Sequence, residues 1–451
     1  MFKKIEIWIL YLAMLIGILF AVGFGVLVRQ ELVGSIKAGW VSEIALNLAE
    51  IPVNLKQIYA SDLKVEDRFP TLDGFNGTSN LEESYLLLSR YDGDLQEGVV
   101  ELVDLTNFEI LHTWNPDIDA FNDLVKKVDE FKYLERDSNN QRKILQHPKL
   151  TKEGGLLFGQ DSPLQKIDAC SRLVFQNTHD RFHHSIENDI DGNIWVPSSI
   201  YPQSLPPEKV GRVIGVDDGY FDDAIVKLTP EGEILFEKSV SQIFIDSGLE
   251  YLLFSVGDRY FDKNPIHLND IQPVNIDGEF WKKGDVFLSL RHQSMILLYR
   301  PSTNEIIWKG VGPFFHQHDV DILDEHRISI FNNNSKDFVD ADIVDGHNEV
   351  IIYDFNTNEY SSYLKDSFVI NDVRTITEGR GQILPNGGLF IEESNYGRTL
   401  FSNADGSLRW AHVNRADDGF VYNVGWSRIL YTQEDIQMVN NLLKNKGTCD
   451  E

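Results

Sequence analysis

The chain has 451 residues, of which 42% are hydrophobic and 11% aromatic, so its composition is that of a globular protein and excludes a largely disordered one. Its 70 acidic and 41 basic residues give a formal charge of −29, which argues against nucleic acid as the main partner, because a phosphate backbone requires a basic surface. The only cysteines, Cys170 and Cys449, make neither a disulfide framework nor a zinc cluster.

The first predicted element is a membrane-spanning helix. Residues Ile7 to Val28 form an uncharged run close to the ~20 residues that cross a bilayer as a helix. Two lysines precede the run, and the bias of basic residues toward the cytoplasm places everything after Arg29 outside. A cleaved signal peptide is the alternative, but the run exceeds the usual apolar core of ~7–15 residues and offers a poor cleavage site. We therefore expect a transmembrane anchor over residues 1–30 and a single-pass protein whose remaining part lies on the periplasmic or extracytoplasmic side.

Helices are also expected at three other places. Apolar residues recur at intervals of three and four from Glu31 to Leu55, so we assign residues 31–75 to a helical linker. The charged insertion from Pro116 to Pro148 permits short helices. Near the other end of the chain, Gln433 to Asn445 is predicted to be a helix, and residues 433–451 are assigned to a C-terminal helix and tail.

Between these segments, one unit recurs six times. Each unit has two alternating strands joined by a turn that carries Asn, Asp, Gly, Pro or Thr, and a further strand of clear type precedes each pair. The six hairpins span residues 99–114, 163–176, 224–239, 295–310, 350–364 and 399–413. An inner strand, a middle strand and an outer hairpin make about four strands per unit, which is the pattern of a propeller blade.

The predicted fold class is therefore all-β: a six-bladed β-propeller over residues 76–432, preceded by one N-terminal transmembrane helix. A strand from Val421 to Leu430 is expected to pair with the first blade and close the ring. A pair of β-sandwiches is the alternative; it would explain the number of strands but not the repeated unit.

Three histidines fall at matching places in successive units. His184, His267 and His318 open the third, fourth and fifth units. The first strand of each propeller blade runs beside the central channel, so equivalent residues converge near the axis. Strand alternation predicts that His267 and Asn269 face the same way, and that His316 faces the same way as His318.

Arg291 ends the strand GDVFLSLR of the fourth unit and reaches the same region. Gln317 and Asp319, which lie next to His318 in the chain, are expected to face away from it. The sequence thus predicts a cluster of imidazoles, one amide and one guanidinium at the mouth of the channel.

Five segments in the same order carry a family resemblance: HLND, GDVFLSLR, NEIIWKG, FHQHDVDILDEHRISIFNNN and ESNYGRTLFSNADGSLRW. Over roughly residues 178–410, the chain resembles the bacterial arylsulfotransferase family. That resemblance implies a six-bladed propeller enzyme that moves a sulfuryl group from a phenolic sulfate ester to another phenol. It also implies that the enzyme needs no nucleotide sulfate donor and works through a sulfated histidine.

The resemblance assigns roles by position. His318 would become sulfated, while His267, Asn269 and Arg291 would bind the sulfuryl oxygens. His184 would match a further active-site histidine, with the adjacent His183 as an alternative register. It implies neither a cofactor nor a metal, and its partners would be a small-molecule aryl sulfate and a phenol, with the membrane contacted through the N-terminal helix.

These residue types suit the chemistry. A neutral imidazole is a competent nucleophile, and a covalent intermediate divides one difficult displacement into two easier ones. The leaving phenolate has a conjugate acid with a pKa near ~10, which makes it a tolerable leaving group. Fixed donors and positive charge stabilise the charge spread over the sulfuryl oxygens, by analogy with phosphoryl transfer.

Several alternatives remain open at this point. Three converging imidazoles are also able to hold zinc or copper, although Arg291 would repel a cation. The run NDIDGN at 188–193 resembles a calcium loop but lacks the later acidic ligand, so a tight turn is expected there. Four other histidines are interpreted as ordinary satisfied polar residues: His112, His147, His347 and His412. As a function, the alternative is a non-catalytic propeller that binds an anionic ligand or a protein partner in the membrane.

Overall fold

The structure is a computed structural model that describes residues 6–32, 37–59, 63–206, 210, 220–255, 261–337, 342–446 and 449. The chain divides into two compact units, each of which is described by itself. The first unit comprises Met1–Asp62, Leu205–Tyr220 and Leu253–Lys263, and the second comprises Leu63–Ser204, Phe221–Leu252 and Asn264–Glu451.

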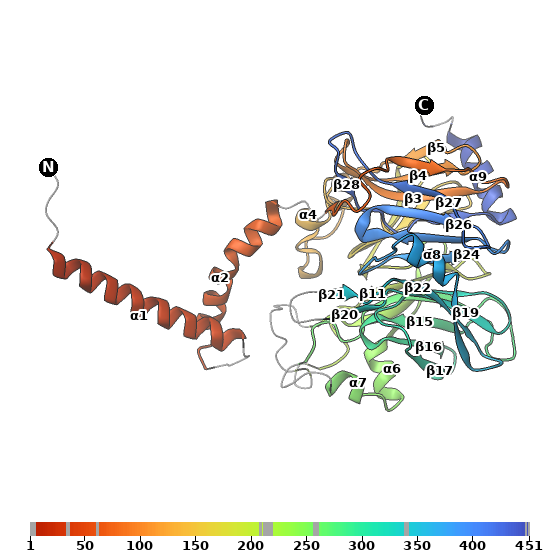
Figure 1. The fold of residues 1–451 in the computed structure, drawn as a ribbon. Coiled ribbons are helices and arrows are strands. Elements are labelled where there is room, and N and C mark those ends of the chain that lie inside the picture. Colours follow the sequence, from red (N-terminus) through yellow and green to blue (C-terminus); the bar gives the residue numbers. More distant parts are fainter. Residues whose placement is uncertain are drawn as a thin grey trace. The chain divides into compact units, whose positions relative to one another are not determined.

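The first unit contains the N-terminal helices α1 (Ile7–Leu32) and α2 (Trp40–Tyr59) (Figure 1). Within α1, the segment Ile7–Glu31 is long and apolar enough to cross a membrane, a property that an N-terminal signal sequence shares. The helix expected from Glu31 to Leu55 is not continuous, because residues 37–39 form a turn before α2 begins.

The second unit is an all-β propeller arrangement with four separate blades (Figure 1). All pairs of neighbouring strands within these sheets are antiparallel. In strand order, the first sheet is β29 (Arg428–Leu430), β3 (Tyr85–Asp92), β4 (Glu97–Asp104) and β5 (Glu109–Trp114), and the second is β14 (Leu268–Pro273), β15 (Val286–Leu290), β16 (Met295–Arg300) and β17 (Glu305–Val311). The third is β18 (His318–Ile322), β19 (Arg327–Asn332), β22 (Glu349–Asp354) and β23 (Glu359–Tyr363). The fourth is β2 (Gly74–Gly77), β27 (Leu408–Val413), β26 (Arg398–Ser402), β25 (Leu389–Glu393) and β24 (Arg380–Ile383).

An eight-stranded sheet completes the arrangement. Its strands are β13 (Ile234–Ser239), β12 (Asp223–Leu228), β11 (Ile194–Ser199), β9 (Leu173–Phe182), β8 (Ser162–Ile167), β7 (Leu156–Phe158) and β6 (Lys149–Leu150), with β10 (Glu187–Asn188) paired to β11. Strands β9 and β11 pair only at Ser198↔Phe182 and Ser199↔Arg181. All six hairpins predicted from the sequence are present among the strands of these five sheets.

Short elements connect the sheets. Two further strand pairs are β1 (Lys64–Val65) with β28 (Val421–Tyr422) and β20 (Ser335–Asp337) with β21 (Asp342–Val344). The short helices are α3 (Ile118–Asn122), η1 (Asp129–Phe131), α4 (Leu134–Asp137), α6 (Val240–Asp246), α7 (Tyr251–Phe254), η2 (Arg291–Gln293), α8 (Lys365–Ile370) and η3 (Ser394–Tyr396). The predicted C-terminal helix is present as α9 (Gln433–Asn445), which begins with a capping box between Thr432 and Asp435.

Segments far apart in the sequence join the first and last blades. The strand predicted from Val421 to Leu430 is broken into β28, which pairs with β1, and β29, which pairs with β3 of the first blade as predicted. Strand β2 pairs with β27. Gly77 of β2 has a φ of 120° and approaches the carbonyl of Arg409 so closely that a Cβ would lie 2.4 Å from it, so only glycine fits. Leu86 and Val103 on one side pack with Phe390 on the other in a shared core, which holds the two blades together.

The two cysteines are bonded to one another, a pairing that the sequence analysis did not predict. Cys170 follows β8, and Cys449 lies after α9, 279 positions later in the chain. Val439 and Leu442 of α9 are fully buried in the core of this part of the propeller. The disulfide and these apolar contacts therefore fix the C-terminal helix to the sheet.

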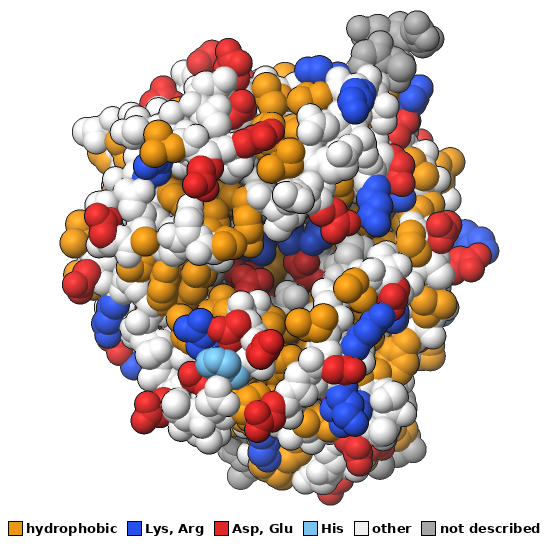
Figure 2. Space-filling model, turned by 90° about the vertical axis from the view of Figure 1, so that its right-hand side faces the viewer, with side chains coloured by type: hydrophobic (Ala, Val, Ile, Leu, Met, Phe, Trp, Pro, Cys, Tyr) orange, Lys and Arg blue, Asp and Glu red, His pale blue; other side chains and the backbone are white. Residues whose placement is uncertain are grey.

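Charged residues occupy the strands that lie nearest the propeller axis. We call them the inner-strand charge cluster: Lys149, Glu187, Asp270, Asp319, Arg380 and Arg428. Glu187 lies 2.8 Å from Lys149 and 2.5 Å from Arg428, and Asp319 lies 3.5 Å from Arg380. The carboxylates also bind the next inner strand, because Asp270 accepts from the Val320 amide at 2.7 Å and Asp319 from the Gly381 amide at 3.0 Å. Figure 2 shows one face hollowed near its centre, with basic and acidic side chains together in the hollow.

Candidate active site

Four of the five predicted site residues line one cavity of about 280 Å³ in the second unit. The lining residues are Gln146, Gln160, Asp161, His183, His184, His267, Arg291, His318, Thr377 and Glu378. His318 opens β18, His267 immediately precedes β14, and Arg291 immediately follows β15. His267 and Arg291 thus come from one sheet and His318 from the next, so neighbouring blades contribute to the cavity as the propeller prediction required.

The imidazole rings form a connected group. The ring centroids of His184 and His267 are 5.0 Å apart, and those of His184 and His318 are 6.4 Å apart. His184 and His267 have φ angles of 57° and 55°, a left-handed conformation that is uncommon outside glycine. The same conformation occurs shortly before three further inner strands, at His147, Glu378 and Trp426, and before β18 at His316.

The hydrogen bonds of His318 define its neutral tautomer. Its Nδ1 lies 2.7 Å from Oδ1 of Asn333 and 3.1 Å from the carbonyl of His316. Both oxygens only accept, so Nδ1 carries the proton and Nε2 keeps its lone pair. Burial, together with the positive charge of Arg291, lowers the pKa of His318 to about 3. His318 is therefore a neutral imidazole at physiological pH, with Nε2 as the available nucleophile.

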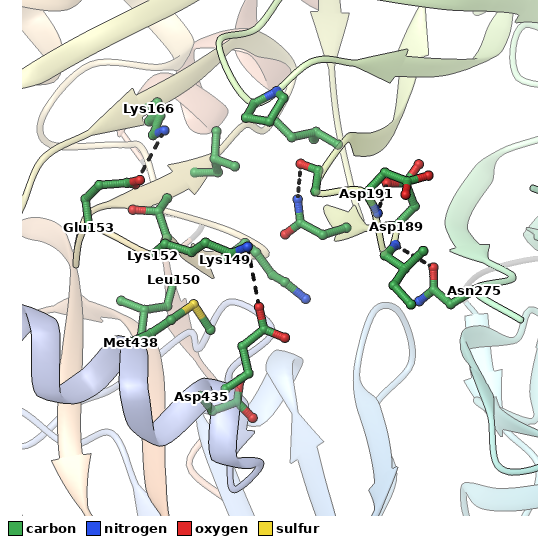
Figure 3. A pocket seen from close by; sticks show the side chains of 18 residues that line it. Lys149, Leu150, Lys152, Glu153, Lys166, Asp189, Asp191, Asn275, Asp435 and Met438 are labelled. Carbon is green, nitrogen blue, oxygen red and sulfur yellow. Dashed lines mark hydrogen bonds and ion pairs between the residues drawn. The ribbon is translucent and has the colours of Figure 1, made fainter.

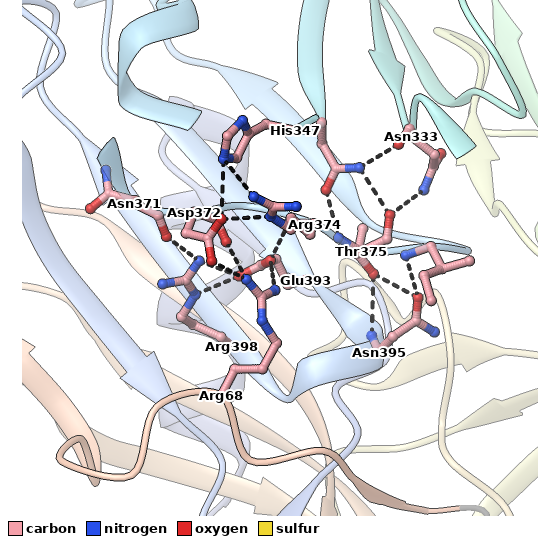
Figure 4. Close-up of polar contacts among 12 residues, drawn as sticks. Arg68, Asn333, His347, Asn371, Asp372, Arg374, Thr375, Glu393, Asn395 and Arg398 are labelled. Carbon is pink, nitrogen blue, oxygen red and sulfur yellow. Dashed lines mark hydrogen bonds and ion pairs between the residues drawn. The ribbon is translucent and has the colours of Figure 1, made fainter. Parts of the chain in front are cut away.

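Asn333 is itself held firmly (Figure 4). Its Nδ2 donates to the carbonyl of Glu378 at 2.7 Å, which fixes the orientation of the amide and leaves Oδ1 directed at His318. Asn348 donates to the backbone carbonyl of Asn333 at 2.6 Å and accepts from the amide of Thr375 at 2.6 Å. The side chain that orients the proposed nucleophile thus belongs to a wider polar network. Asn333 was not predicted as a site residue, although the run of three asparagines beside Phe331, the register partner of His318, was a signal.

Arg291 has a free donor in a buried position. Its Nη1 donates to Nε2 of His292 at 2.7 Å, and Nδ1 of His292 donates to the carbonyl of Asn264 at 2.5 Å. The closest carboxylate, Asp342, is 4.0 Å from Nη2. Nε of Arg291 has no hydrogen-bond partner among the residues that the structure describes. A buried guanidinium with an unused N–H is suited to binding an anion.

His267 and His184 are neutral, too. Burial and the neighbouring histidines hold the pKa of both residues well below the usual range. Nδ2 of Asn264 donates to Nδ1 of His267 at 2.8 Å, so the proton of neutral His267 is on Nε2, where it serves as a donor. His184 shares a hydrogen bond with His183 through their Nδ1 atoms, 2.7 Å apart.

Asn269 is the predicted site residue that does not line the cavity. It is fully buried, and its Nδ2 donates to the backbone carbonyl of Gln317 at 2.8 Å. It therefore fixes the backbone immediately before His318. Its Oδ1 has no partner within the described part of the chain.

The prediction that His316 faces the same way as His318 is wrong. His316 lies before β18 and does not line the cavity that His318 lines. Its ring lies 5.9 Å from that of His292, and its Nδ1 lies 3.6 Å from Asp337. Alternation holds only inside a regular strand. Here His316 itself has a φ of 51°, so the chain is not extended where the alternation was assumed.

A family model described as "Arylsulfotransferase (ASST)" matches residues 147–415. The chain belongs to the arylsulfotransferase family. The match spans every lining residue of the cavity except Gln146 and includes Asn333. Membership suggests aryl sulfotransferase activity and small-molecule aryl substrates.

Other comparisons give more distant likenesses. No curated protein matches the chain significantly. A Bacteroides caccae protein of unknown function is similar at 13% identity, with 76% of this chain and 98% of that chain covered and a TM-score of 0.44. TolB from Acinetobacter baumannii is similar at 8% identity, with coverages of 77% and 66% and a TM-score of 0.40. The WD40 β-propeller domain of Doa1 is similar at 11% identity, with coverages of 83% and 98% and a TM-score of 0.37.

The interpretation of His147 as a satisfied polar residue is wrong for this arylsulfotransferase family member. His147 is buried, with its ring centroid 3.7 Å from that of Trp426 and 5.8 Å from that of His184. Neither ring nitrogen has a hydrogen-bond partner among the described residues. The signal was its place before the inner strand β6, which matches the place of His184 before β10. By contrast, His112 contacts the carbonyl of Ala169 at 2.8 Å, as an ordinary polar residue does.

A second pocket of about 400 Å³ lies among β6, β10 and α9 (Figure 3). Its lysines all have carboxylate partners: Lys149 with Glu187 at 2.8 Å, Lys152 with Glu434 at 3.8 Å and Lys166 with Glu153 at 3.7 Å. The loop 188–193 lines the pocket, and Asp189 accepts hydrogen bonds from the backbone of Asp191 and Asn193. That arrangement confirms the tight turn expected there.

Proposed function

We propose that this chain transfers a sulfuryl group from a phenolic sulfate ester to a phenol through a covalent bond to Nε2 of His318. The observation that carries the proposal is the convergence of a neutral His318, with its tautomer set by Asn333, and a buried Arg291 with an unused donor in one cavity. Family membership supports the same reaction class.

In the first half of the reaction, the lone pair on Nε2 of His318 attacks sulfur in line. The bond between sulfur and the ester oxygen breaks, and the phenol oxygen leaves with the electron pair. The imidazole ring gains positive charge as the N–S bond forms. The Nδ1–H bonds to Asn333 and the carbonyl of His316 strengthen as that charge develops, which stabilises the intermediate.

The sulfuryl oxygens need donors that are already in place. Nε of Arg291 and Nε2–H of His267 supply two in this proposal, and His184 lines the same cavity. Asn269 fixes the backbone before His318 through the Gln317 carbonyl. Its direct contact with the sulfuryl oxygens remains a prediction from the family resemblance.

In the second half, an acceptor phenol attacks the same sulfur atom, the N–S bond breaks, and neutral His318 is regenerated. Because the histidine stores the group, the reaction needs no nucleotide sulfate donor. No step in this scheme requires a metal ion.

The proposal also covers the fold and the placement of the chain. Six blades are supported by the left-handed residues that come shortly before six inner strands: His147, His184, His267, His316, Glu378 and Trp426. The eight-stranded sheet then contains two blades that touch through β9 and β11. We assign residues 76–432 to this propeller and residues 31–75 to the linker.

Residues 1–30 are assigned to a transmembrane anchor that leaves the propeller on the periplasmic or extracytoplasmic side. The apolar helix α1 supports the anchor. The bond between Cys170 and Cys449 supports the location, because disulfides persist mainly in oxidising compartments.

The test uses the full chain in detergent with a nitrophenyl sulfate donor. Wild type is expected to release one equivalent of nitrophenol without an acceptor and to continue when phenol is added. Mass analysis is expected to find a sulfuryl group on the peptide that contains His318. His318→Asn removes the nucleophile at similar volume and is expected to abolish both signals.

A non-catalytic binding module would give the opposite pattern. It would bind aryl sulfates with the same affinity in wild type and His318→Asn, and neither protein would release phenol. Phenol transfer that survives His318→Asn would overturn the role proposed for His318.

A further inference from the structure

A carboxyl group lines the same cavity as His318 and was not selected from the sequence. It belongs to Glu378, which lies two residues before β24 and has a φ of 55°. The backbone carbonyl of Glu378 accepts from Nδ2 of Asn333 at 2.7 Å. One amide therefore positions both His318 and Glu378, and the strained backbone places the Glu378 side chain at the cavity rather than in the sheet.

Few neighbouring groups of the Glu378 carboxyl hold it in one protonation state. Oε1 accepts from Nε2 of Gln146 at 2.8 Å, whereas Oε2 has no hydrogen-bond partner among the described residues. The charged groups that act on it, Glu392 of β25 and Asp161 before β8, are both acidic. Burial, reinforced by these two carboxylates and opposed by Gln146, raises the pKa of Glu378 to about 7. Both protonation states are thus populated at neutral pH.

The transfer of a sulfuryl group between phenols requires a group that gives and takes a proton at neutral pH. A poor leaving phenolate needs a proton as its bond to sulfur breaks, and an attacking phenol must lose one. The nearby imidazoles are less suited, because His184, His267 and His318 are all held neutral with a pKa well below 7. A proton carrier is most efficient when its own pKa lies near the working pH.

We propose that Glu378 is the catalytic acid and base that serves the aryl oxygen. The proposal rests on the function proposed above and adds to it the proton transfers. In the first half, Nε2 of His318 bonds to sulfur, the ester S–O bond breaks, and the Glu378 carboxyl gives its proton to the departing oxygen. In the second half, the acceptor oxygen bonds to sulfur, the N–S bond breaks, and the Glu378 carboxylate takes the phenol proton. Each half leaves Glu378 in the state that the other half requires.

The experiment separates leaving groups by their basicity. Acceptor-free single turnovers are measured for wild type and Glu378→Gln with a series of phenyl sulfates from the nitro-substituted to the unsubstituted ester. Nitrophenolate leaves without a proton, so Glu378→Gln is expected to lose less than about tenfold with it. With the unsubstituted ester, the loss is expected to be about 10²–10⁴-fold.

The second half is measured on the sulfated enzyme. For wild type, the rate of transfer to phenol is expected to rise with pH through about 7, because the deprotonated carboxylate is the base. Glu378→Gln is expected to be slow and to lack this inflection. Glu359→Gln is the matched control, since it makes the same change at an exposed carboxylate on the outer strand β23, away from the cavity. Its rates are expected to depend on the leaving group as steeply as those of wild type.

The outcomes are distinct. An equal loss across all leaving groups in Glu378→Gln, or a retained pH inflection, would overturn the assignment while leaving the role of His318 intact. A wild type that neither releases phenol nor gains a sulfuryl adduct would overturn the proposed function and this assignment together. Adduct formation from nitrophenyl sulfate by Glu378→Gln shows that the variant is folded with a working nucleophile.

Discussion

Nδ1 of His318 lies 2.7 Å from Oδ1 of Asn333, and Nδ2 of the same asparagine lies 2.7 Å from the carbonyl of Glu378. One amide therefore fixes the tautomer of the proposed nucleophile and also fixes the segment that carries the proposed acid and base. An amide is well suited to this task because its oxygen only accepts and its nitrogen only donates.

The first prediction concerns this asparagine. Asn333→Ala is expected to slow adduct formation about 10- to 100-fold, because His318 then loses the acceptor that keeps its proton on Nδ1. Asn333→Asp is expected to recover part of the rate, since its carboxylate also accepts from Nδ1. Single-turnover release of nitrophenol measures both, and Asn403→Ala, on a hairpin turn, is the control. Equal rates for Asn333→Ala and wild type would contradict the role of Asn333.

A second prediction concerns Arg291. Arg291→Lys keeps the charge but loses the unused Nε–H and the bond from Nη1 to His292, so we expect a loss of about 10²–10³-fold in the rate of adduct formation. Arg300, which pairs with Asp285 immediately before β15, does not line the cavity. Arg300→Lys is therefore expected to react at the wild-type rate. A comparable loss in both variants would mean that the effect at Arg291 is a general loss of stability.

The pH dependence of the first half-reaction follows from the pKa of His318. Burial and Arg291 lower that pKa to about 3, so the imidazole is already deprotonated at every pH above about 4. With nitrophenyl sulfate, which needs no proton on its leaving group, the single-turnover rate is expected to be flat from about pH 5 to 8. Stopped-flow measurement of nitrophenol release provides the check. A fall in rate below pH 6.5 would show that His318 titrates as an ordinary histidine.

The fourth prediction concerns stability. Burial holds the pKa of His147 well below its usual 6.5, so the unfolded chain binds a proton at His147 in mildly acidic solution and the folded chain does not. This lowered pKa contributes stability above pH 6.5 and loses it as the pH falls. Relative to His147→Gln, which has no titrating ring, the wild type is expected to lose about 2 kcal/mol between pH 7.5 and 5.0. Urea unfolding of both proteins at the two pH values measures this change in the free energy of unfolding. If the two proteins differed in free energy of unfolding by the same amount at both pH values, the prediction would be contradicted.

Much of the propeller was predictable because each hairpin carries its own local signal. The six turns contain the residues that turn dihedrals require, and the last part of the strand predicted at Val421–Leu430 pairs with β3, as closure of the ring suggested. The pairing of β2 with β27 was not predictable. Gly74–Gly77 is too short and too rich in glycine to read as a strand, and its place depends on the edge that β27 offers.

The candidate site, like the fold, was predictable only in part. The repeat position of His184, His267 and His318 was enough to bring the three rings to one cavity. The orientation of individual side chains was not predictable, because Asp319 interrupts the strand that alternation assumes to be regular. Asn333 and Glu378 escaped attention for another reason. Their hydrogen bonds join segments 15 and 45 positions apart, and such contacts leave no periodic trace in the chain.

The inner-strand charge cluster has a consequence for the order of binding. An aryl ring that passed along the propeller axis would have to separate buried pairs such as Arg380 and Asp319, at a cost of ~3–5 kcal/mol for each broken pair. We therefore expect aryl ligands to reach the cavity without passing along the axis. In the proposed reaction we expect donor and acceptor to share one entrance, so the first phenol departs before the second arrives, and the sulfated histidine has to stay intact against water in the interval between them.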